Sequence, residues 1–232
     1  MEPESAKIPS MDLPTQSLPT PLPANPFELT AEWLKQATLD AAQPNPNSMV
    51  LATVDAEGYP SARVVLCKDI LVERGAVSFY TNYESRKGRE LTETGRAAIV
   101  FHWDHRHRQV RIEGRVERLP ESQSDAYFAS RPWQSRLGAW SSKQSQPIAS
   151  LAALKEQVRA TARHFDIDYA GPGSPEPAVV NADIPRPLHW GGFVLVAHAI
   201  ELWVEGQFRL HERVRWSRSP EGGEWSAERL QP

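Results

Sequence analysis

The sequence predicts a mainly β fold with peripheral helices, of the α+β class, in which short antiparallel strands form a closed or partly closed barrel. Residues 109–119 give the clearest strand, because Val110, Ile112 and Val116 alternate with polar and charged side chains. A turn at Glu57-Gly58 joins two β-rich segments into a hairpin. No glycine-rich phosphate loop is present, so nothing indicates a doubly wound nucleotide-binding fold.

The other elements follow from local signals. Asn25 and Pro26 are typical of a helix N-cap and first helical position, and Pro44 and Pro46 break the helix that follows. Helices are predicted over 26–42, 120–130 and 150–165, with another beginning near Ser85. Further strands are predicted over residues 49–55, 59–68, 77–81, 97–103, 192–197, 199–204, 210–217 and 225–230.

The chain is predicted to form one domain over residues 26–232, preceded by an extended or disordered arm over 1–25 that is rich in proline. Residues 132–147 are predicted to form a polar loop, and 166–187, with five prolines, an irregular insertion.

Composition excludes several classes of protein. A net charge of −3 argues against a general nucleic-acid binder, so an anion site must be a local arrangement. No run approaches the roughly 20 apolar residues of a membrane span. The single cysteine, Cys67, cannot form an internal disulfide, which suits a reducing cytoplasm. Within an apolar strand, this thiol is expected to be buried and inert.

Two basic segments could bind phosphate. Ser85-Arg86-Lys87-Gly88 stands where a strand meets a helix start, so backbone N–H groups add to its two cations. The alternative is an ordinary solvated helix start. Arg63 and Lys68 flank an apolar run and point to opposite faces of a regular strand, so both reach one ligand only near a strand end or bulge. Otherwise they are edge residues.

A second phosphate site is predicted around residues 127–135. Tyr127 and Arg131 share a helical face, and Ser135 can fold back toward them from the following loop. A phenol, a guanidinium and a hydroxyl suit a phosphate. The alternative is a helix C-terminus with its usual cation.

Near the C-terminus, Arg209, His211 and Arg213 follow Trp203 closely, and their side chains share one face if this segment is a strand. On one face of a strand they would form a row of donors for an anion.

Metal and nucleic-acid sites are not predicted. His102, His105 and His107 match no usual zinc spacing. The basic stretch over residues 106–118 is interrupted by two glutamates and lacks aromatic side chains for base stacking.

Taken together, residues 26–232 resemble the pyridoxamine 5'-phosphate oxidase family. Each motif is weak alone, and their common order carries the resemblance. They are Arg63-Val64-Val65-Leu66-Cys67-Lys68, Phe79-Tyr80-Thr81-Asn82 with Ser85-Arg86-Lys87, Arg108-Gln109-Val110, Ser130-Arg131-Pro132, Gly138-Ala139-Trp140, Lys143-Gln144-Ser145, Trp190-Gly191-Gly192 and the block 203–213.

The resemblance implies a split β-barrel of antiparallel Greek-key type that forms a homodimer and binds FMN at the subunit interface. It implies FMN contacts from Arg63, Val64, Val65, Leu66, Cys67, Lys68, Tyr80, Thr81, Arg86, Lys87, Gln109, Gln144, Ser145, Trp203 and Arg213. It places the substrate against Lys68, Tyr127, Arg131, Ser135, Arg209, Leu210 and His211, with Arg209 and His211 catalytic.

The implied reaction is oxidation of pyridoxamine or pyridoxine 5'-phosphate by O₂ to pyridoxal 5'-phosphate. It releases hydrogen peroxide, and ammonia from the amine, and it belongs to vitamin B6 coenzyme synthesis or salvage. Two alternatives remain open: a flavin oxidase of the same fold that acts on another ring, as in phenazine formation, and a non-catalytic binder of FMN or pyridoxal phosphate. Retention of Tyr127, Arg131 and Ser135 favours a phosphorylated substrate.

Overall fold

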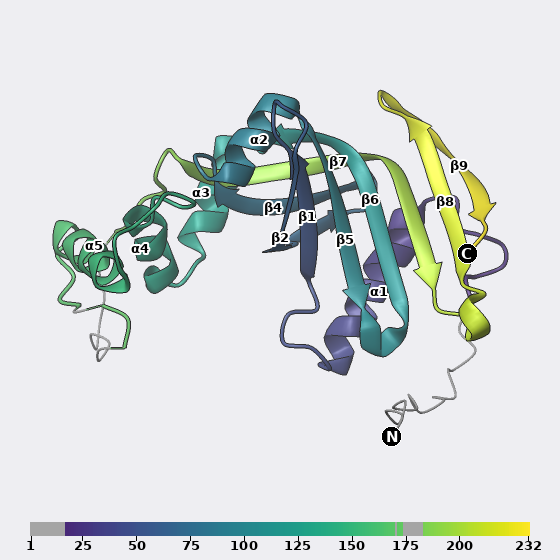
Figure 1. Ribbon diagram of the computed structural model, residues 1–232, viewed down its shortest axis with the longest axis horizontal. Coiled ribbons are helices and arrows are strands. Elements are labelled where there is room, and N and C mark those ends of the chain that lie inside the picture. Colours follow the sequence, from purple (N-terminus) through teal and green to yellow (C-terminus); the bar gives the residue numbers. More distant parts are fainter. Residues whose placement is uncertain (1–16, 170, 174–182) are drawn as a thin grey trace, which may run out of the picture.

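The computed structural model describes residues 17–169, 171–173 and 183–232. Its centre is one antiparallel sheet, with α4 and α5 beyond one end and the β8–β9 hairpin at the other (Figure 1). The mainly β architecture with peripheral helices is therefore confirmed. Its strands are β1 (Ser48–Val54), β2 (Pro60–Leu66), β3 (Asp69–Leu71), β4 (Ala76–Asn82), β5 (Arg96–Trp103), β6 (Arg108–Arg118), β7 (Trp190–Val204), β8 (Glu212–Ser219) and β9 (Gly222–Leu230).

The strands pair in the order β2-β1-β5-β6-β7-β4-β3, and β8 extends the sheet from β7 to β9. Every ladder in the described residues is antiparallel. β6 follows the predicted alternation: Val110 and Ile112 are fully buried, and Val116 is partly buried against the same core.

β7 is one continuous strand, so the prediction of two strands over 192–197 and 199–204 is wrong in that respect. Its register against β6 shifts where Glu113 faces Ala199 and Gly114 faces Ala197, which leaves His198 as an extra residue. Such a bulge bends a strand. β4 pairs with β7 before this point and β8 pairs with it afterwards, so one strand serves both parts of the sheet.

The helices are α1 (Pro26–Asp40), α2 (Arg86–Thr94), α3 (Glu121–Ala129), α4 (Trp133–Ser141) and α5 (Leu151–His164). The Asn25 side chain caps α1 by accepting from the N–H of Phe27, and the Ser85 hydroxyl caps α2 by accepting from the N–H of Gly88. α4 was not predicted. It lies where a polar loop was expected, and buried Leu137 joins it to a core that includes Phe128 and Trp190.

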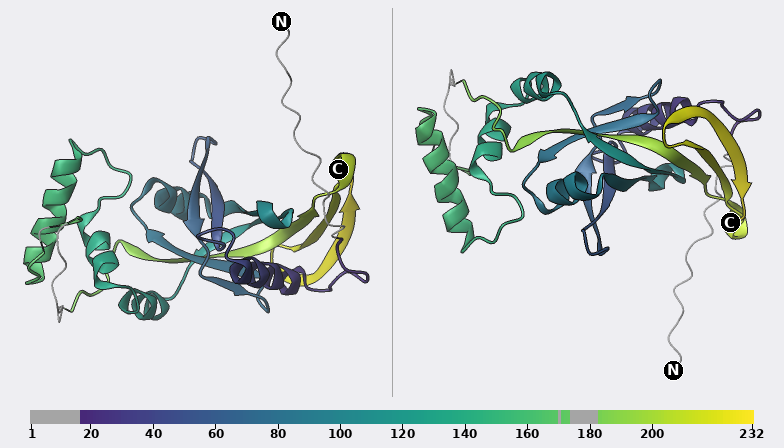
Figure 2. Two further views of the ribbon diagram at one scale, coloured as in Figure 1. Left: turned by 90° about the horizontal axis from the view of Figure 1, so that it is seen from below. Right: turned by 90° about the horizontal axis from the view of Figure 1, so that it is seen from above.

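The main core lies between the sheet and α1, which contributes Phe27, Trp33 and Ala37. Figure 2 shows the same layers from two further sides, with α4 and α5 projecting beyond the sheet. The segment before α1 also takes part, because Leu18 is buried and its N–H donates to the Glu212 carboxylate at 2.8 Å. Residues 17–25, predicted as part of an extended or disordered arm, therefore pack against the domain at Leu18. Residues 1–16 lie outside the described part of the chain.

The predicted strand over 210–217 begins later, at Glu212. Residues Gln207–Arg209 instead form a short 3₁₀ turn, η2, in which Phe208 and Arg209 have positive φ of 56° and 66°. The condition for Arg209, His211 and Arg213 to share one face, a single strand through all three, is therefore not met. The physical reason is local: Gly206 allows the backbone to close tightly, since a Cβ there would lie 1.9 Å from the carbonyl oxygen of Leu210.

Candidate functional site

A cavity of about 580 Å³ opens between β2, β4, α2 and the segment that contains α3 and α4. It gathers twelve of the predicted site residues: Arg63, Val64, Val65, Leu66, Lys68, Tyr80, Thr81, Lys87, Tyr127, Arg131, Ser135 and Gln144. We call it the pocket. Its lining also includes Asn82, Gly138, Ala139, Ser142 and Trp190.

Lys87 contributes a partly buried cation at the first turn of α2. Its Nζ donates to Gln144 Oε1 at 2.8 Å, to Thr81 Oγ1 at 3.3 Å and to Ser85 Oγ at 3.4 Å. Burial, together with the positive charge of Arg63, lowers the pKa of Lys87, while Glu90 opposes that shift. These donors reach neutral oxygens, so a phosphate can supply the negative charge beside the helix N-terminus.

Arg63 and Arg86 meet at one buried carboxylate, Glu90. Arg63 Nη2 lies 3.3 Å from Glu90 Oε2, and Arg86 Nε donates to Glu90 Oε1 at 2.7 Å. Thr53 also donates its hydroxyl to Glu90. Burial raises the pKa of Glu90, but the bonds from Thr53 and Arg86 and the charge of Arg63 hold it below its ordinary value.

An aromatic wall lines another side of the pocket. Tyr80 stacks on Tyr127 with ring centroids 4.1 Å apart and on Trp190 at 5.4 Å. The guanidinium of Arg131 lies 4.6 Å from the centroid of Trp190. Burial lowers the pKa of Arg131, and its Nη1 is buried without a hydrogen-bond partner among the described residues. Such an atom is suited to an anionic ligand that completes its hydrogen bonds.

Four residues predicted to hold the substrate phosphate line the pocket together, and we call them the phosphate cup: Lys68, Tyr127, Arg131 and Ser135. Two of them lie on other elements than the sequence suggested. Ser135 lies in the first turn of α4 rather than in a loop, and Arg131 lies beyond the end of α3. Lys68 follows the last residue of β2, and its Nζ is 5.2 Å from the centroid of Tyr127. The expected condition for Arg63 and Lys68 to share a ligand, a nearby strand end, is met.

Six of the residues predicted to contact the cofactor do not line the pocket. Three of these six belong to segments that border it: Cys67, Arg86 and Ser145. Cys67 points into the main core, where burial raises the pKa of its thiol to about 12, as expected for an inert cysteine. Arg86 lies beside the pocket, held by Glu90. Ser145, with φ of 70°, lies in the loop after Gln144.

The remaining predicted cofactor residues form a row on the opposite part of the sheet. Gln109 on β6 faces Trp203 on β7, which faces Arg213 on β8. Cross-strand partners point to the same side of a sheet, so the three side chains lie together. Buried Glu201 holds Arg213 through two bonds, at 2.9 and 3.1 Å, and raises its pKa.

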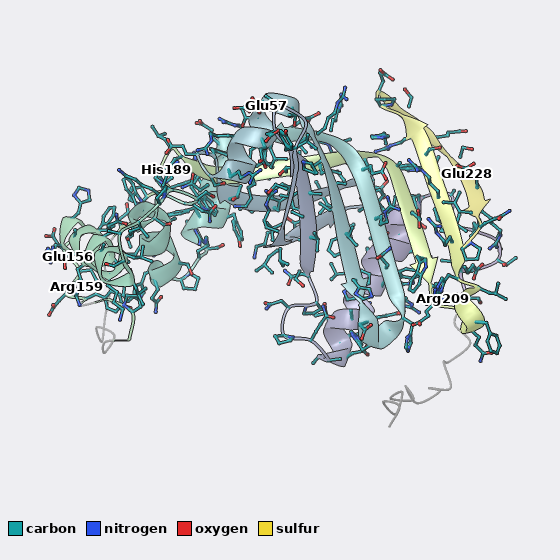
Figure 3. The ribbon with its side chains drawn as sticks, in the orientation of Figure 1. Glu57, Glu156, Arg159, His189, Arg209 and Glu228 are labelled. Carbon is teal, nitrogen blue, oxygen red and sulfur yellow. The ribbon has the colours of Figure 1, made fainter. Side chains whose placement is uncertain are left out.

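Arg209, Leu210 and His211 lie at the end of this row. The His211 ring packs against Trp203 with centroids 4.7 Å apart, and its Nδ1 accepts from the N–H of Gly206 at 3.2 Å. Figure 3 shows Arg209 far from His189, the neighbour of pocket residue Trp190. We call Gln109, Trp203, Arg209, Leu210, His211 and Arg213 the distal group. One chain therefore does not bring the distal group to the pocket.

Sequence reasoning missed Glu90 and Trp190. A signal for Glu90 existed, since it stands four residues after Arg86 on one helix and can pair with it. Trp190 belongs to the family motif Trp190-Gly191-Gly192, but nothing in the sequence placed it in the wall, because that place depends on contacts with Tyr80 and Phe128 from distant elements.

No cluster of metal-ligating side chains occurs among the residues that the structure describes. Within the same residues, no helix has the length and apolar character needed to cross a membrane.

The fold and the pocket together define a class: an antiparallel β protein with a cationic, aromatic-walled cavity suited to phosphorylated ring compounds. Comparison with known proteins is more specific. Residues 36–164 match the family model described as pyridoxamine 5'-phosphate oxidase, and residues 190–232 match the pyridoxine 5'-phosphate oxidase C-terminal dimerisation region. The chain therefore belongs to the pyridoxine/pyridoxamine 5'-phosphate oxidase family, a family of oxidoreductases.

Curated relatives agree over most of the chain. The pyridoxine/pyridoxamine 5'-phosphate oxidase of Paraburkholderia xenovorans (strain LB400) is 48% identical over 208 residues, which is 90% of this chain and 89% of the relative. The protein of the same name from Brucella anthropi is 45% identical over 210 residues, covering 90% and 95%.

Among solved structures, PhzG from Burkholderia lata 383, in complex with tetrahydrophenazine-1-carboxylic acid, has a TM-score of 0.79 and 29% identity, covering 95% of this chain and 100% of that chain. A pyridoxamine 5'-phosphate oxidase-related, FMN-binding protein from Nostoc punctiforme PCC 73102 shares the fold, with a TM-score of 0.63 and 17% identity over 88% of this chain and 96% of that chain.

Proposed function

We propose that the protein oxidises pyridoxamine 5'-phosphate and pyridoxine 5'-phosphate to pyridoxal 5'-phosphate, with FMN as cofactor and O₂ as electron acceptor. Hydrogen peroxide is the second product, and the amine substrate also releases ammonia. The observation that carries this proposal is that one pocket contains two sets of cations. Arg63 and Lys87 come from β2 and α2, whereas Lys68 and Arg131 accompany Tyr127 and the aromatic wall.

The residues fit a phosphorylated flavin. Lys87 and the N-terminus of α2 offer donors for its phosphate, and Arg63 adds positive charge. Thr81 and Gln144 offer polar atoms beside Lys87 for the polar edge of a ring system. When bound, FMN supplies the electron acceptor for the carbon that is oxidised.

The substrate phosphate is held by Lys68, Tyr127, Arg131 and Ser135. Arg131 binds it most strongly, because its buried Nη1 lacks another partner among the described residues. The stacked rings of Tyr80, Tyr127 and Trp190 form a rigid apolar wall that limits water in the pocket. Fixing the phosphate in this way orients the C4' carbon, which matters because transfer to a flavin tolerates little displacement.

Arg209 and His211 act at the amino or hydroxyl group on C4'. Because Nδ1 of His211 accepts a backbone hydrogen bond, the neutral ring carries its proton on Nε2. In that form, Nε2 donates a hydrogen bond to the substrate and cannot accept its proton.

Two subunits are needed for a complete site. The distal group lies far from the pocket of its own chain, so the pocket receives this group from a partner subunit across a two-fold interface (Figure 3). Exposed apolar side chains support a covering partner: Val64 and Leu66 at the pocket, and Phe208 and Leu210 at the distal turn. We infer the split-barrel, Greek-key arrangement of this homodimer, and a cytoplasmic location, from the family.

Anaerobic mixing with pyridoxamine 5'-phosphate tests this function. The FMN-loaded protein should lose its flavin absorbance and regain it on admission of air, with pyridoxal 5'-phosphate and hydrogen peroxide formed in equal amounts. Boiled protein with free FMN serves as the control. A flavin spectrum unchanged by substrate would indicate that the protein binds FMN without catalysing this oxidation.

Oxidation of a phenazine precursor is the second candidate, favoured by the 29% identity and extensive structural match to PhzG. The two functions differ in their need for a phosphate. Flavin reduction by a tricyclic carboxylic acid, unaffected by Arg131→Ala, would establish the second function in place of the first.

A further inference from the structure

Glu90 is a buried carboxylate on α2 that the oxidation reaction does not use directly. Its side chain is 4% exposed, yet it accepts hydrogen bonds from three groups, two on neighbouring strands and one on its own helix. Thr53 comes from β1, Arg63 from β2 and Arg86 from the first turn of α2. A buried carboxylate with this many partners holds all of them in one arrangement.

The bonds leave particular donors available. Arg86 meets Glu90 through Nε, so its two terminal nitrogens can turn toward an anion. One of them, Nη2, lies 4.0 Å from the Asp55 carboxylate. Arg63 is held by Glu90, by the Thr53 and Ser61 hydroxyls and by the carbonyl of Leu51, and it still lines the pocket. The position of both guanidinium groups therefore depends on Glu90.

Charge gives Glu90 a second effect. Arg63, Arg86 and Lys87 are like charges close together, and the positive charge of Arg63 lowers the pKa of Lys87. Glu90 offsets this repulsion and favours the charged form of Lys87. It therefore keeps the cations assembled before any ligand arrives, which lowers the cost of binding a phosphate.

We propose that Glu90 is a positioning residue that prearranges Arg63, Arg86 and Lys87 for the phosphate of the flavin. This inference rests on the proposed function, since it takes FMN as the ligand. It makes a distinctive prediction, because riboflavin has the same ring system as FMN but no phosphate.

The test compares the two flavins on the purified homodimer by fluorescence quenching. Glu90→Gln keeps the shape of the side chain and should weaken FMN binding by about tenfold, while riboflavin affinity changes less than about twofold. Thr53→Val, which removes one of the links between Glu90 and Arg63, should produce a smaller loss of the same kind. Glu93→Gln, an exposed glutamate on the same helix, is the matched control and should change neither affinity.

The outcomes separate the hypotheses. Equal loss of both flavins in Glu90→Gln would show a general structural role and overturn the proposal. Unchanged FMN binding would also overturn it, because Glu90 would then have no net effect on the phosphate. Tighter FMN binding would overturn it too, because Glu90 would then mainly repel the phosphate. If the unaltered protein binds neither flavin, the proposed function itself fails. Melting curves of each variant show whether it is folded.

Discussion

The pocket and the distal group both hold arginines against a buried carboxylate, but in different surroundings. At the pocket, cations from β2 and α2 border a cavity and gather around buried Glu90. In the distal group, Arg213 stands in a row across three adjacent strands and is held by buried Glu201. Each region has an internal carboxylate as a fixed partner for its arginines. Of these two regions, only the pocket borders a cavity formed by the described residues. Under the proposed function, the distal group completes the cavity of a partner subunit.

The largest expected effect is on activity when subunits are mixed, which tests whether the distal group of one chain completes the pocket of the other. A dimer that pairs a Lys87→Ala chain with an Arg209→Ala chain should retain about half of the wild-type activity, because a two-fold dimer has two sites and one combines two unaltered halves. Each parent homodimer should have little activity at limiting FMN. Differently tagged chains allow the mixed dimer to be purified and assayed for peroxide.

The matched control places both substitutions on one chain and pairs it with a wild-type chain. Each site then contains one altered half, so this dimer should be nearly inactive. If each chain instead forms its own site, the activities of the two mixed dimers would exchange. The distal group would then not complete the pocket of a partner subunit.

Arg131→Ala tests the substrate side of the pocket. Loss of a charge-assisted hydrogen bond from its buried guanidinium should raise KM for pyridoxamine 5'-phosphate about tenfold. FMN affinity should stay unchanged, because under the proposed function other cations hold the flavin phosphate. Steady-state kinetics and flavin titration measure the two quantities.

Arg163→Ala, on the exposed face of α5, is the control for this prediction and should leave KM unaltered. An unchanged KM in Arg131→Ala as well would remove Arg131 from the phosphate cup.

Acid stability gives the smallest effect. The pKa of Glu90 in the folded chain lies below its ordinary value of 4.5, so its contribution to stability is present above that value. The contribution is lost as the pH falls through the lowered folded pKa. The melting temperature of FMN-free wild-type protein should therefore exceed that of Glu90→Gln at pH 7, and the difference should shrink below about pH 4.5.

Differential scanning fluorimetry between pH 7 and pH 3.5 measures this difference, with Glu93→Gln as the reference. A gap between wild type and Glu90→Gln that widens on acidification would contradict the lowered pKa.

Local patterns predicted much of the fold. The alternation of apolar residues identified β6, and the Asn25–Pro26 signal gave the start of α1. α4 was missed because Leu137 is its main apolar anchor, and the partners that bury it come from other elements. β7 was divided at residue 198, and the bulge lies there, so the pattern registered a real irregularity but not the continuity of the strand.

The residues of the candidate site were predicted, but not which of them lie together within one chain. The family resemblance gave the residues of both the pocket and the distal group, and twelve of them line the pocket. Nothing in the spacing of Trp203 or Arg213 shows that β8 lies at the other end of the sheet, because strand order depends on long-range pairing. The η2 turn was not predicted, since positive φ at Phe208 and Arg209 has no clear sequence signature.

The continuity of β7 limits how this chain can change in length. Trp190 borders the pocket and Trp203 belongs to the distal group, and the 13 steps between them in Trp190–Val204 span about 43 Å of extended backbone at roughly 3.3 Å per residue. Removing or adding one residue there would reverse which face each later side chain occupies. Natural variation in length should therefore collect in surface connections, while the number of residues separating these two tryptophans stays constant.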